Sequence, residues 1–360
     1  MQFYKDLISV VVPAFNQPDY LKRLLHSIIR QTYRPIEIIV SDDCSKMSLE
    51  RVVNGFNKFT NQNLRIKFYR NSKNLGVMGN FRFAVEQASG KYLLPFAHDN
   101  RLTDDNYFAE SINIMQITPD CHISIANSKF ENSDRKMLGS CEGGRNNSWR
   151  IFNGGDFISK YRRGGLNWSQ ATIVDHEVAC CMKAYDEPFM ISPELSRKLK
   201  IAQDNISAFV FVLSAVGSVA LTQKCVCEIG VPKDSYSRTK IWQDTKKRVK
   251  FVIFFNIYTS GLKGKYARAC KKMAFKQAME YVDYIRDIKI IKYYNWSAKI
   301  FVLVALSFIK IPWFQLRQFN KKLRHIFKKD SSPTKIKKSD IETIHFTKKL
   351  FASTVKYKQW

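Results

Sequence analysis

The chain has 360 residues, 45% of them hydrophobic, so it is long and apolar enough to bury a core in one large or two medium domains. Its formal net charge of +28 is uneven, because residues 241–360 hold 28 Lys and Arg against only 7 Asp and Glu. The first 240 residues therefore have the charge balance of an ordinary enzyme, and the C-terminal part attracts polyanions such as nucleic acid or an anionic membrane surface.

The spacing of the cysteines and the residue pattern at the N-terminus indicate in which cellular compartment the protein is expected. None of the eight cysteines has metal-ligand or redox spacing, because Cys180-Cys181 and Cys225-Val-Cys227 are too close for tetrahedral zinc. We expect reduced thiols in a cytosolic protein. The N-terminus begins with a strand pattern and not with a basic stretch followed by a long apolar one, so no signal peptide is predicted.

The first 45 residues predict a strand, a helix and a second strand. Residues 8–16 are an apolar, β-branched run, residues 19–30 repeat apolar positions at helical spacing, and residues 36–45 are a second buried-type strand. Ligands bind such βαβ units at the carboxyl ends of the strands. One crevice is therefore expected to be lined by the residues that end the two strands, Pro13 to Asn16 and Asp42 to Ser45.

The alternation of strands and helices continues along the chain. Further strands are predicted at 64–69, 90–97 and 121–126, and helices at 76–88, at 104–117 after a Thr103 cap, and at 199–216. This order implies an α/β fold with a mainly parallel, doubly wound sheet. Residues 127–170 are rich in Gly, Asn and Ser and are expected to form loops around a substrate site.

The chain from about residue 240 reads as helices rich in Lys and aromatic residues. We predict a catalytic domain over 1–240, a basic membrane-associating region over 241–330 and a loosely ordered tail over 331–360. The apolar stretch 300–309 is too short for a bilayer span, which needs about 20 residues. Flanking Trp and Lys residues favour a helix in the membrane interface, and a buried core helix is the alternative.

Three polar groups are candidates for chemistry. Asp42 and Asp43 can accept hydrogen bonds from a base and a ribose, or can cap a turn. The oxygen-rich run His98-Asp99-Asn100 suits Mg²⁺ or Mn²⁺ bound with a diphosphate, or is a polar turn. Asp204 can be a general base, or a partner of a helix dipole. No Gly-x-Gly-x-x-Gly follows the first strand and no P-loop pattern occurs.

Taken together, these motifs resemble the family 2 glycosyltransferases of the GT-A fold. The resemblance rests on Ser-Val-Val-Val-Pro-Ala-Phe-Asn, on Glu-Ile-Ile-Val-Ser-Asp-Asp-Cys-Ser and on Asn74-Leu-Gly76, followed by the Gly90-Lys-Tyr92 strand. It is close over residues 7–110 and loose as far as about 240. It implies that the chain uses a nucleotide-diphosphate sugar, most often a UDP-sugar, and inverts the anomeric carbon with the help of Mg²⁺ or Mn²⁺.

The resemblance also implies roles for individual residues. Asp99, with Asn100, matches the metal and diphosphate position, and Asp204 matches the catalytic base that deprotonates the acceptor hydroxyl. Two positions depart from the family pattern: the usually acidic motif is His98-Asp99-Asn100, and Gln203 replaces the Glu that normally precedes the base. The donor nucleotide is assigned to Pro13, Ala14, Phe15, Asn16, Asp42, Asp43, Asn74 and His98.

The resulting prediction is a metal-dependent hexosyltransferase of surface-polysaccharide or O-antigen synthesis. Its acceptor is expected to be a lipid-linked glycan, and its location the cytoplasmic face of the membrane, where Lys and Arg residues bind anionic lipid. A non-catalytic sugar-nucleotide binder is one alternative. A basic module that binds nucleic acid or membrane is another, but nucleic acid is not the expected partner, because no such module is recognisable and the basic residues are mixed with large apolar ones.

Overall fold

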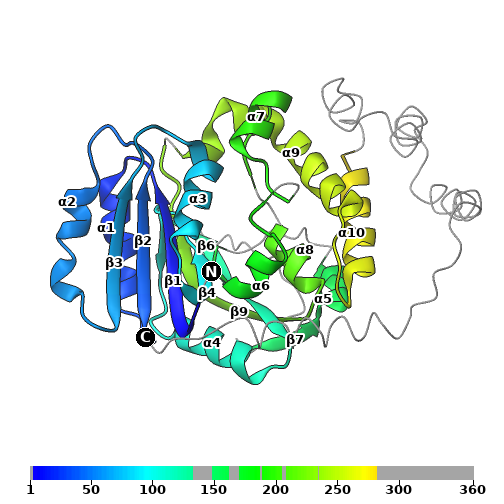
Figure 1. Ribbon diagram of the computed structural model, residues 1–360, viewed down its shortest axis with the longest axis horizontal. Coiled ribbons are helices and arrows are strands. Elements are labelled where there is room, and N and C mark those ends of the chain that lie inside the picture. The colour runs from blue at the N-terminus through cyan, green and yellow to red at the C-terminus, as the bar shows by residue number, and fades with distance from the viewer. Residues whose placement is uncertain are drawn as a thin grey trace, which may run out of the picture. The chain divides into compact units, whose positions relative to one another are not determined.

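The computed structural model describes residues 3–132, 148–161, 170–186, 189–204, 208–233 and 235–281 (Figure 1). Within these residues, nine strands form one mixed sheet with the order β3-β2-β1-β4-β8-β6-β9-β5, and β7 pairs with β9. The strands are β1 (Tyr4–Ala14), β2 (Ile36–Asp42), β3 (Leu64–Arg70), β4 (Gly90–Pro95), β5 (Asn100–Leu102), β6 (Cys121–Phe130), β7 (Arg150–Asn153), β8 (Thr172–Asp175) and β9 (Ser218–Ile229).

The half of the sheet that contains the N-terminus is parallel, as the sequence predicts. β1 pairs in parallel with both β2 and β4, and β2 pairs in parallel with β3. Ala14 is opposite Asp42, so the first two strands end at the same level. The other half is mixed, because β8 is antiparallel to both of its neighbours, β4 and β6. The parallel half determines where the candidate site lies, since its carboxyl ends form one edge.

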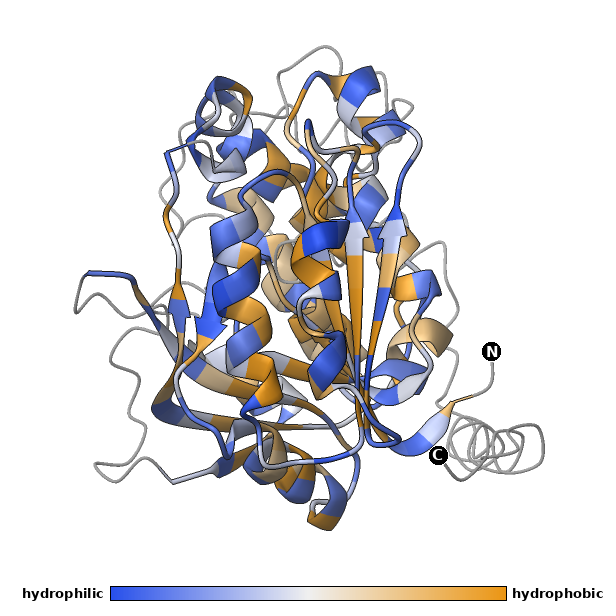
Figure 2. Ribbon diagram, turned by 90° about the vertical axis from the view of Figure 1, so that its left-hand side faces the viewer, coloured by the Kyte–Doolittle hydropathy of each residue, from blue (hydrophilic) through white to orange (hydrophobic). Residues whose placement is uncertain are grey.

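Helices cover the sheet on both faces. They are α1 (Pro18–Ile29), α2 (Glu50–Asn54), α3 (Gly76–Glu86), α4 (Tyr107–Ile117), α5 (Gly154–Tyr161), α6 (His176–Cys181), α7 (Pro193–Leu199), α8 (Ala208–Ser214), α9 (Lys240–Thr259) and α10 (Ala267–Met279). Ile8, Val10 and Val12 of β1 share a buried cluster with residues of α1, α2 and α4. In Figure 2 the strands are mostly orange and the helices alternate orange with blue, as expected for amphipathic helices on a buried sheet.

The compact unit extends past residue 240 to Glu280. α9 and α10 pack against each other, and together they contact α5 and α8. Phe251, Phe254 and Phe255 of α9 are almost completely buried. The first 40 residues of the predicted basic region thus complete the core of this unit, and the stretch 300–309 and the tail 331–360 lie outside the described residues. No helix in the described ranges is both long and apolar enough to cross a bilayer.

The helix predicted over 199–216 is confirmed only for α8, Ala208–Ser214, and its first part is wrong. α7 ends at Leu199, where Lys200 adopts a left-handed conformation with φ 54°, and the Ser196 hydroxyl donates to the carbonyl of Ile201 at 2.6 Å. The chain is then extended to Asp204, and α8 begins only at Ala208. Ile201 and Ala202 are buried although they are not helical. An apolar run of this length fits a buried extended segment as well as a helix.

Two other sequence expectations differ from the structure. Thr103 does not cap α4, which begins at Tyr107, because its backbone N–H donates to the carbonyl of Val226 at 2.8 Å beside β5. The expected loop region 127–170 contains the end of β6 together with β7 and α5. Strand pairing with β9 orders part of a segment whose composition is typical of loops.

A buried carboxylate joins the parallel strands near their amino ends. Glu37 of β2 is completely buried and accepts hydrogen bonds from the Ser9 hydroxyl at 2.6 Å and from the Ser89 backbone N–H at 2.6 Å. Lys67 of β3 forms an ion pair with the same carboxylate, with its Nζ 2.8 Å from Glu37 Oε2. Burial acts to raise the pKa of Glu37, but these hydrogen bonds hold it below its usual value. The charge is therefore retained inside the sheet.

A buried histidine should make folding sensitive to mild acid. His176 is fully buried, with Nδ1 3.1 Å from the carbonyl of Gly90, and burial lowers its pKa from 6.5 to about 4. The unfolded chain thus binds a proton below pH 6.5 that the folded protein takes up only near pH 4. Stability falls as the pH drops through this window, by about 3 kcal/mol in total.

The variant His176→Asn separates the contribution of His176 to the pH dependence of stability. The side-chain amide of the Asn can still donate to the Gly90 carbonyl, but it does not titrate. Urea unfolding at pH 7, 6, 5 and 4.5 should give a steeper loss of free energy for the wild type than for the variant. Equal slopes would show that His176 is not the titrating group. Glu37 contributes only at lower pH, because its depressed pKa affects stability below about pH 4.5.

Candidate functional site

The loops that follow β1 and β2 lie side by side, as the sequence predicts. The backbone N–H of Asn16 donates to the Ser45 hydroxyl at 2.7 Å, and the Asn16 side chain accepts from the Lys46 N–H at 3.1 Å. Asn16 and Cys44 both have left-handed backbones, with φ of 56° and 59°. Phe15 is 43% exposed at the rim of these loops, where an aromatic ring can stack on a base.

The two neighbouring aspartates have different surroundings. Asp42 is completely buried and accepts hydrogen bonds from the N–H and hydroxyl of Ser45 and from Arg70. Its carboxylate therefore stabilises the loop that begins at residue 43. The Leu49 N–H donates a fourth bond to Asp42 at 3.4 Å, so its acceptor positions are filled and an indirect role fits better than the direct donor contact that the sequence predicts.

Asp43 lies at the junction of two loops. Its carboxylate accepts from the Asn71 amide at 3.0 Å, from the Leu75 N–H at 2.7 Å and from the Gly76 N–H at 2.9 Å. A carboxylate can accept about four hydrogen bonds, so one acceptor position remains. Asn74 lies beside it and donates from its amide to the Asp43 carbonyl at 3.2 Å. Asp43 and Asn74, which are predicted from separate motifs, are thus brought together.

The third predicted group follows β4. His98 is placed against β1, with Nδ1 3.3 Å from the carbonyl of Pro13, and the carbonyl of Asp99 accepts from the Gly230 N–H at 3.0 Å. This brings the 98–100 turn to the same edge of the sheet as the β1 loop. The backbone contact with Gly230 needs glycine there, because a Cβ would lie 2.1 Å from the Asp99 oxygen.

The 98–100 turn has a limited set of metal ligands. Asn100 is 2% exposed, its amide donates to Gln170 at 3.3 Å, and its Oδ1 has no hydrogen-bond partner among the described residues. A buried oxygen of this kind fits a cation or its water. The described residues contain no group of three His, Cys, Asp or Glu side chains that could bind a metal. Asp99 and Asn100 could each provide one oxygen ligand to a divalent ion, and its other ligands would have to come from outside this turn.

Asp204 is positioned by an extended segment. The Ile191 N–H donates to the Asp204 carbonyl at 2.7 Å, forming an isolated bridge. The preceding residue, Gln203, donates its backbone N–H to the Tyr236 hydroxyl at 2.8 Å and accepts from the Met78 N–H through Oε1 at 3.0 Å. Burial raises the pKa of Tyr236 above its usual value, and the negative charge of Asp204 acts in the same direction. Tyr236, in the 3₁₀ helix η3 (Tyr236–Arg238), thus accepts a hydrogen bond from the residue next to Asp204.

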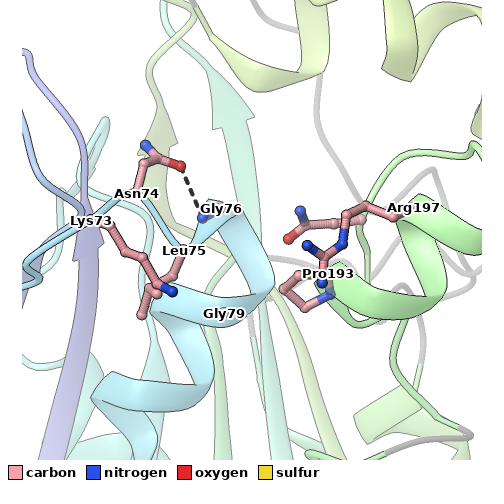
Figure 3. A pocket seen from close by; sticks show the side chains of 8 residues that line it. Lys73, Asn74, Leu75, Gly76, Gly79, Pro193 and Arg197 are labelled. Atoms are coloured by element: carbon pink, nitrogen blue, oxygen red, sulfur yellow. Dashed lines mark hydrogen bonds between the residues drawn. The ribbon is translucent and has the colours of Figure 1, made fainter.

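Gln203 thus joins the Asp204 segment to the start of α3, which also holds Asp43. Gly76, with φ of 77°, makes this contact possible, because a Cβ there would lie 2.6 Å from the Gln203 amide. Beside the contact is a pocket of about 500 Å³ (Figure 3), whose lining comes from the 73–79 segment and from the chain around α7. It is lined by Lys73, Asn74, Leu75, Gly76, Gly79, Pro193, Arg197 and Gln203.

Sequence reasoning did not identify several of these residues. Gln203 was noted only as a departure from the family pattern, and Tyr236, Lys73 and Arg197 were not predicted as site residues. Tyr236 lies between Ser235 and Ser237, for which the family resemblance implies, only weakly, a role over the donor phosphates, so this stretch did contain a weak signal. Lys73 and Arg197 gave no sequence signal, because surface cations are common in a chain with 59 Lys and Arg.

The contact of Gln203 with α3 can be tested directly. The variant Gln203→Ala removes the acceptor of the Met78 N–H, so we expect faster hydrogen exchange of that amide and a loss of about 1 kcal/mol in the free energy of unfolding. Gln203→Glu is the matched control, because a carboxylate still accepts the bond. Unchanged protection of Met78 in the Ala variant would mean that Gln203 does not hold the two segments together.

The arrangement of the strands defines the class of fold. Two crystal structures of S. aureus TarS 1-349, in complex with UDP-GlcNAc and with UDP, match it with TM-scores of 0.54 and 0.51. They are 13% and 15% identical in sequence and cover 81% and 87% of this chain, and 76% and 77% of TarS 1-349. The fold is that of the GT-A glycosyltransferases.

One family model matches the N-terminal part of the chain. The family model described as glycosyl transferase family 2 matches residues 9–179, which include the loops after β1, β2 and β4. This segment is therefore similar to the family 2 glycosyltransferases.

Three curated relatives match shorter segments. The abequosyltransferase RfbV of Salmonella typhimurium is 37% identical over 102 residues. The putative teichuronic acid biosynthesis glycosyltransferase TuaG of Bacillus subtilis is 27% identical over 105 residues. The GalNAc(5)-diNAcBac-PP-undecaprenol beta-1,3-glucosyltransferase of Campylobacter jejuni is 35% identical over 96 residues. These matches cover 26–29% of this chain and 30–40% of the relatives.

Proposed function

We propose that this protein is a glycosyltransferase that transfers a sugar from a nucleotide diphosphate to a hydroxyl of a growing surface glycan. One observation supports this most strongly: the Asp43 carboxylate accepts from Gly76 at the start of α3, Gln203 beside Asp204 accepts from Met78 of the same helix, and His98 beside Asp99 lies against Pro13. The site therefore contains a donor-binding carboxylate, a diphosphate-side carboxylate and a candidate base, which are the groups that a sugar transfer requires.

The donor nucleotide is proposed to bind at the ends of β1 and β2. Asp43, which retains one acceptor position, accepts a hydrogen bond from the base or ribose, and Phe15 stacks on the base. Asn74 and Asp42 act through the loops, since Asn74 donates to the backbone of Asp43 and Asp42 holds Ser45. Pro13 and His98 position the Asp99 turn against this site.

The reaction is proposed to proceed with inversion at the sugar carbon. Asp204 removes the proton from the acceptor hydroxyl, whose oxygen attacks the anomeric carbon as the bond to the nucleotide diphosphate breaks. Mg²⁺ or Mn²⁺, when held by Asp99 and Asn100, supplies Lewis-acid stabilisation of charge on the leaving diphosphate. Gln203 positions Asp204 by its two hydrogen bonds to Met78 and Tyr236.

The acceptor is proposed to be a lipid-linked glycan at the cytoplasmic face of the membrane. The net charge of +21 over residues 241–360 supports attraction to anionic lipid, at about 1 kcal/mol for each well-placed Lys or Arg. The Campylobacter relative, whose name includes PP-undecaprenol, supports an acceptor of this type. The full chain should sediment with vesicles containing anionic lipid at low salt and be released at high salt. A chain that never sediments with them would contradict the membrane location.

The function is tested with the full chain and a set of nucleotide sugars. Thermal unfolding is followed with UDP-, dTDP- and GDP-sugars, each with and without Mn²⁺. Binding of one class should raise the melting temperature by mass action, and the shift should depend on the metal. UDP-sugars are favoured, in line with the ligands of TarS. A folded protein that responds to no donor under any of these conditions would contradict the proposal.

A further inference from the structure

Two cations on different segments of the chain line the pocket beside Gln203. Lys73 lies in the loop before α3, and Arg197 lies on α7 (Figure 3). The eight lining residues include no Asp or Glu. Within the described residues, neither cation takes part in an ion pair, although Arg70 and Lys67 nearby in sequence are paired with Asp42 and Glu37. The pocket thus has two positive side chains without a described acidic partner.

The positive side chains, and not the start of α3, are the main feature of the pocket. Two of the first three backbone N–H groups of that helix already have acceptors, because the Gly76 N–H donates to Asp43 and the Met78 N–H donates to Gln203. Lys73 and Arg197 are both exposed and can turn toward a ligand. Their pocket, of about 500 Å³, is large enough for a phosphorylated group with its water.

We propose that the pocket between Lys73 and Arg197 is a binding site for a phosphate or diphosphate group. Arg provides a planar fork of donors for phosphate oxygens, and Lys provides a point charge, so the pair suits a phosphate better than a carboxylate with only two oxygens. The polar side chain of Gln203 lines the pocket, and Asp204 is the next residue in the chain. The proposal rests on the proposed function only for the source of the phosphate, which is either the sugar donor or a phosphorylated acceptor.

The first experiment measures the affinity of inorganic pyrophosphate for the full chain by calorimetry in the presence of EDTA. EDTA removes divalent metal, so binding that depends on Asp99 and a metal does not contribute. The double variant Lys73→Gln with Arg197→Gln should bind pyrophosphate on the order of tenfold or more weakly than the wild type. The control Lys22→Gln with Lys198→Gln removes the same charge from exposed positions that do not line the pocket and should bind as the wild type does. Equal affinity of the wild type and the first double variant would overturn the proposal.

A second experiment distinguishes the two sources of the phosphate. If the pocket holds the donor diphosphate, the advantage of UDP over uridine in binding should fall in the Lys73/Arg197 variant. If it holds a phosphate of the acceptor, UDP affinity should be unchanged, and pyrophosphate should still bind the wild type saturated with UDP. A protein that binds pyrophosphate through these cations but binds no nucleotide sugar would retain this site and contradict the proposed function instead.

Discussion

Replacing Asp204 with Asn should lower the rate of sugar transfer by about 10²- to 10⁴-fold, because the amide cannot accept the proton of the acceptor hydroxyl. The backbone and Gln203 contacts that hold this segment do not involve the Asp204 carboxylate. Asp204 is held through its backbone carbonyl, which accepts from Ile191, and through its neighbour Gln203, so the substitution preserves both attachments. The change should appear in kcat, while the donor-induced shift in melting temperature remains that of the wild type.

Asp244→Asn is the matched control for this variant. Asp244 is an exposed carboxylate on α9 and does not line the pocket, so its neutralisation should leave the transfer rate within about twofold. Full activity in Asp204→Asn would exclude this residue as the base. A loss of both donor binding and activity would instead indicate that Asp204 supports the fold of the site, and amide exchange at Met78 would then be altered as well.

Replacing Asp99 with Ala should abolish the part of donor binding that depends on Mn²⁺. Asp99 is the one carboxylate of the 98–100 turn, and its loss leaves only the uncharged Asn100 oxygen and His98 to interact with a divalent ion. The melting-temperature shift produced by the nucleotide sugar with Mn²⁺ should fall to the value seen with EDTA. Transfer should slow by about 10²-fold or more, as expected when a Lewis acid is lost from a leaving diphosphate.

The variant Asn100→Asp gives the opposite change at the neighbouring position. A second carboxylate adds negative charge where the Asn100 oxygen is already buried without a described partner, so the Mn²⁺ concentration needed for half of the shift should decrease. An identical metal dependence in the wild type, Asp99→Ala and Asn100→Asp would show that the turn does not bind the metal.

Asp42 and Asp43 are adjacent in the sequence, but the sequence alone does not predict their different hydrogen-bond partners. Asp42 is the last residue of β2, Asp43 follows it, and both were assigned to the donor. Both are buried, but the Asp42 carboxylate accepts from Arg70 and Ser45, and the Asp43 carboxylate accepts from the Gly76 loop. The sequence shows that two acids are present, but the side each one faces depends on the residues that pack around it.

The first part of the helix predicted over 199–216, which the structure contradicts, has a similar explanation. Apolar residues at 201 and 202 are buried by the tertiary structure, and their spacing alone does not distinguish a helix from an extended buried segment. Asp204 was found from a motif resemblance, yet its attachment to α3 through Gln203 joins residues 125 positions apart. A contact at this separation has no local signal in the chain.

The sequence by itself determined the parallel half of the sheet and the position of the polar groups at its edge. This was possible because alternation of buried strands and amphipathic helices is a local property, and parallel strands bring their carboxyl ends to one edge. Only the tertiary structure decided which of these groups face one another, that Gln203 links Asp204 to the loop of Asp43, and that Lys73 and Arg197 line one pocket. Those relations depend on the packing of α7 against α3 and on the contact of η3 with Gln203, which no short stretch of sequence specifies.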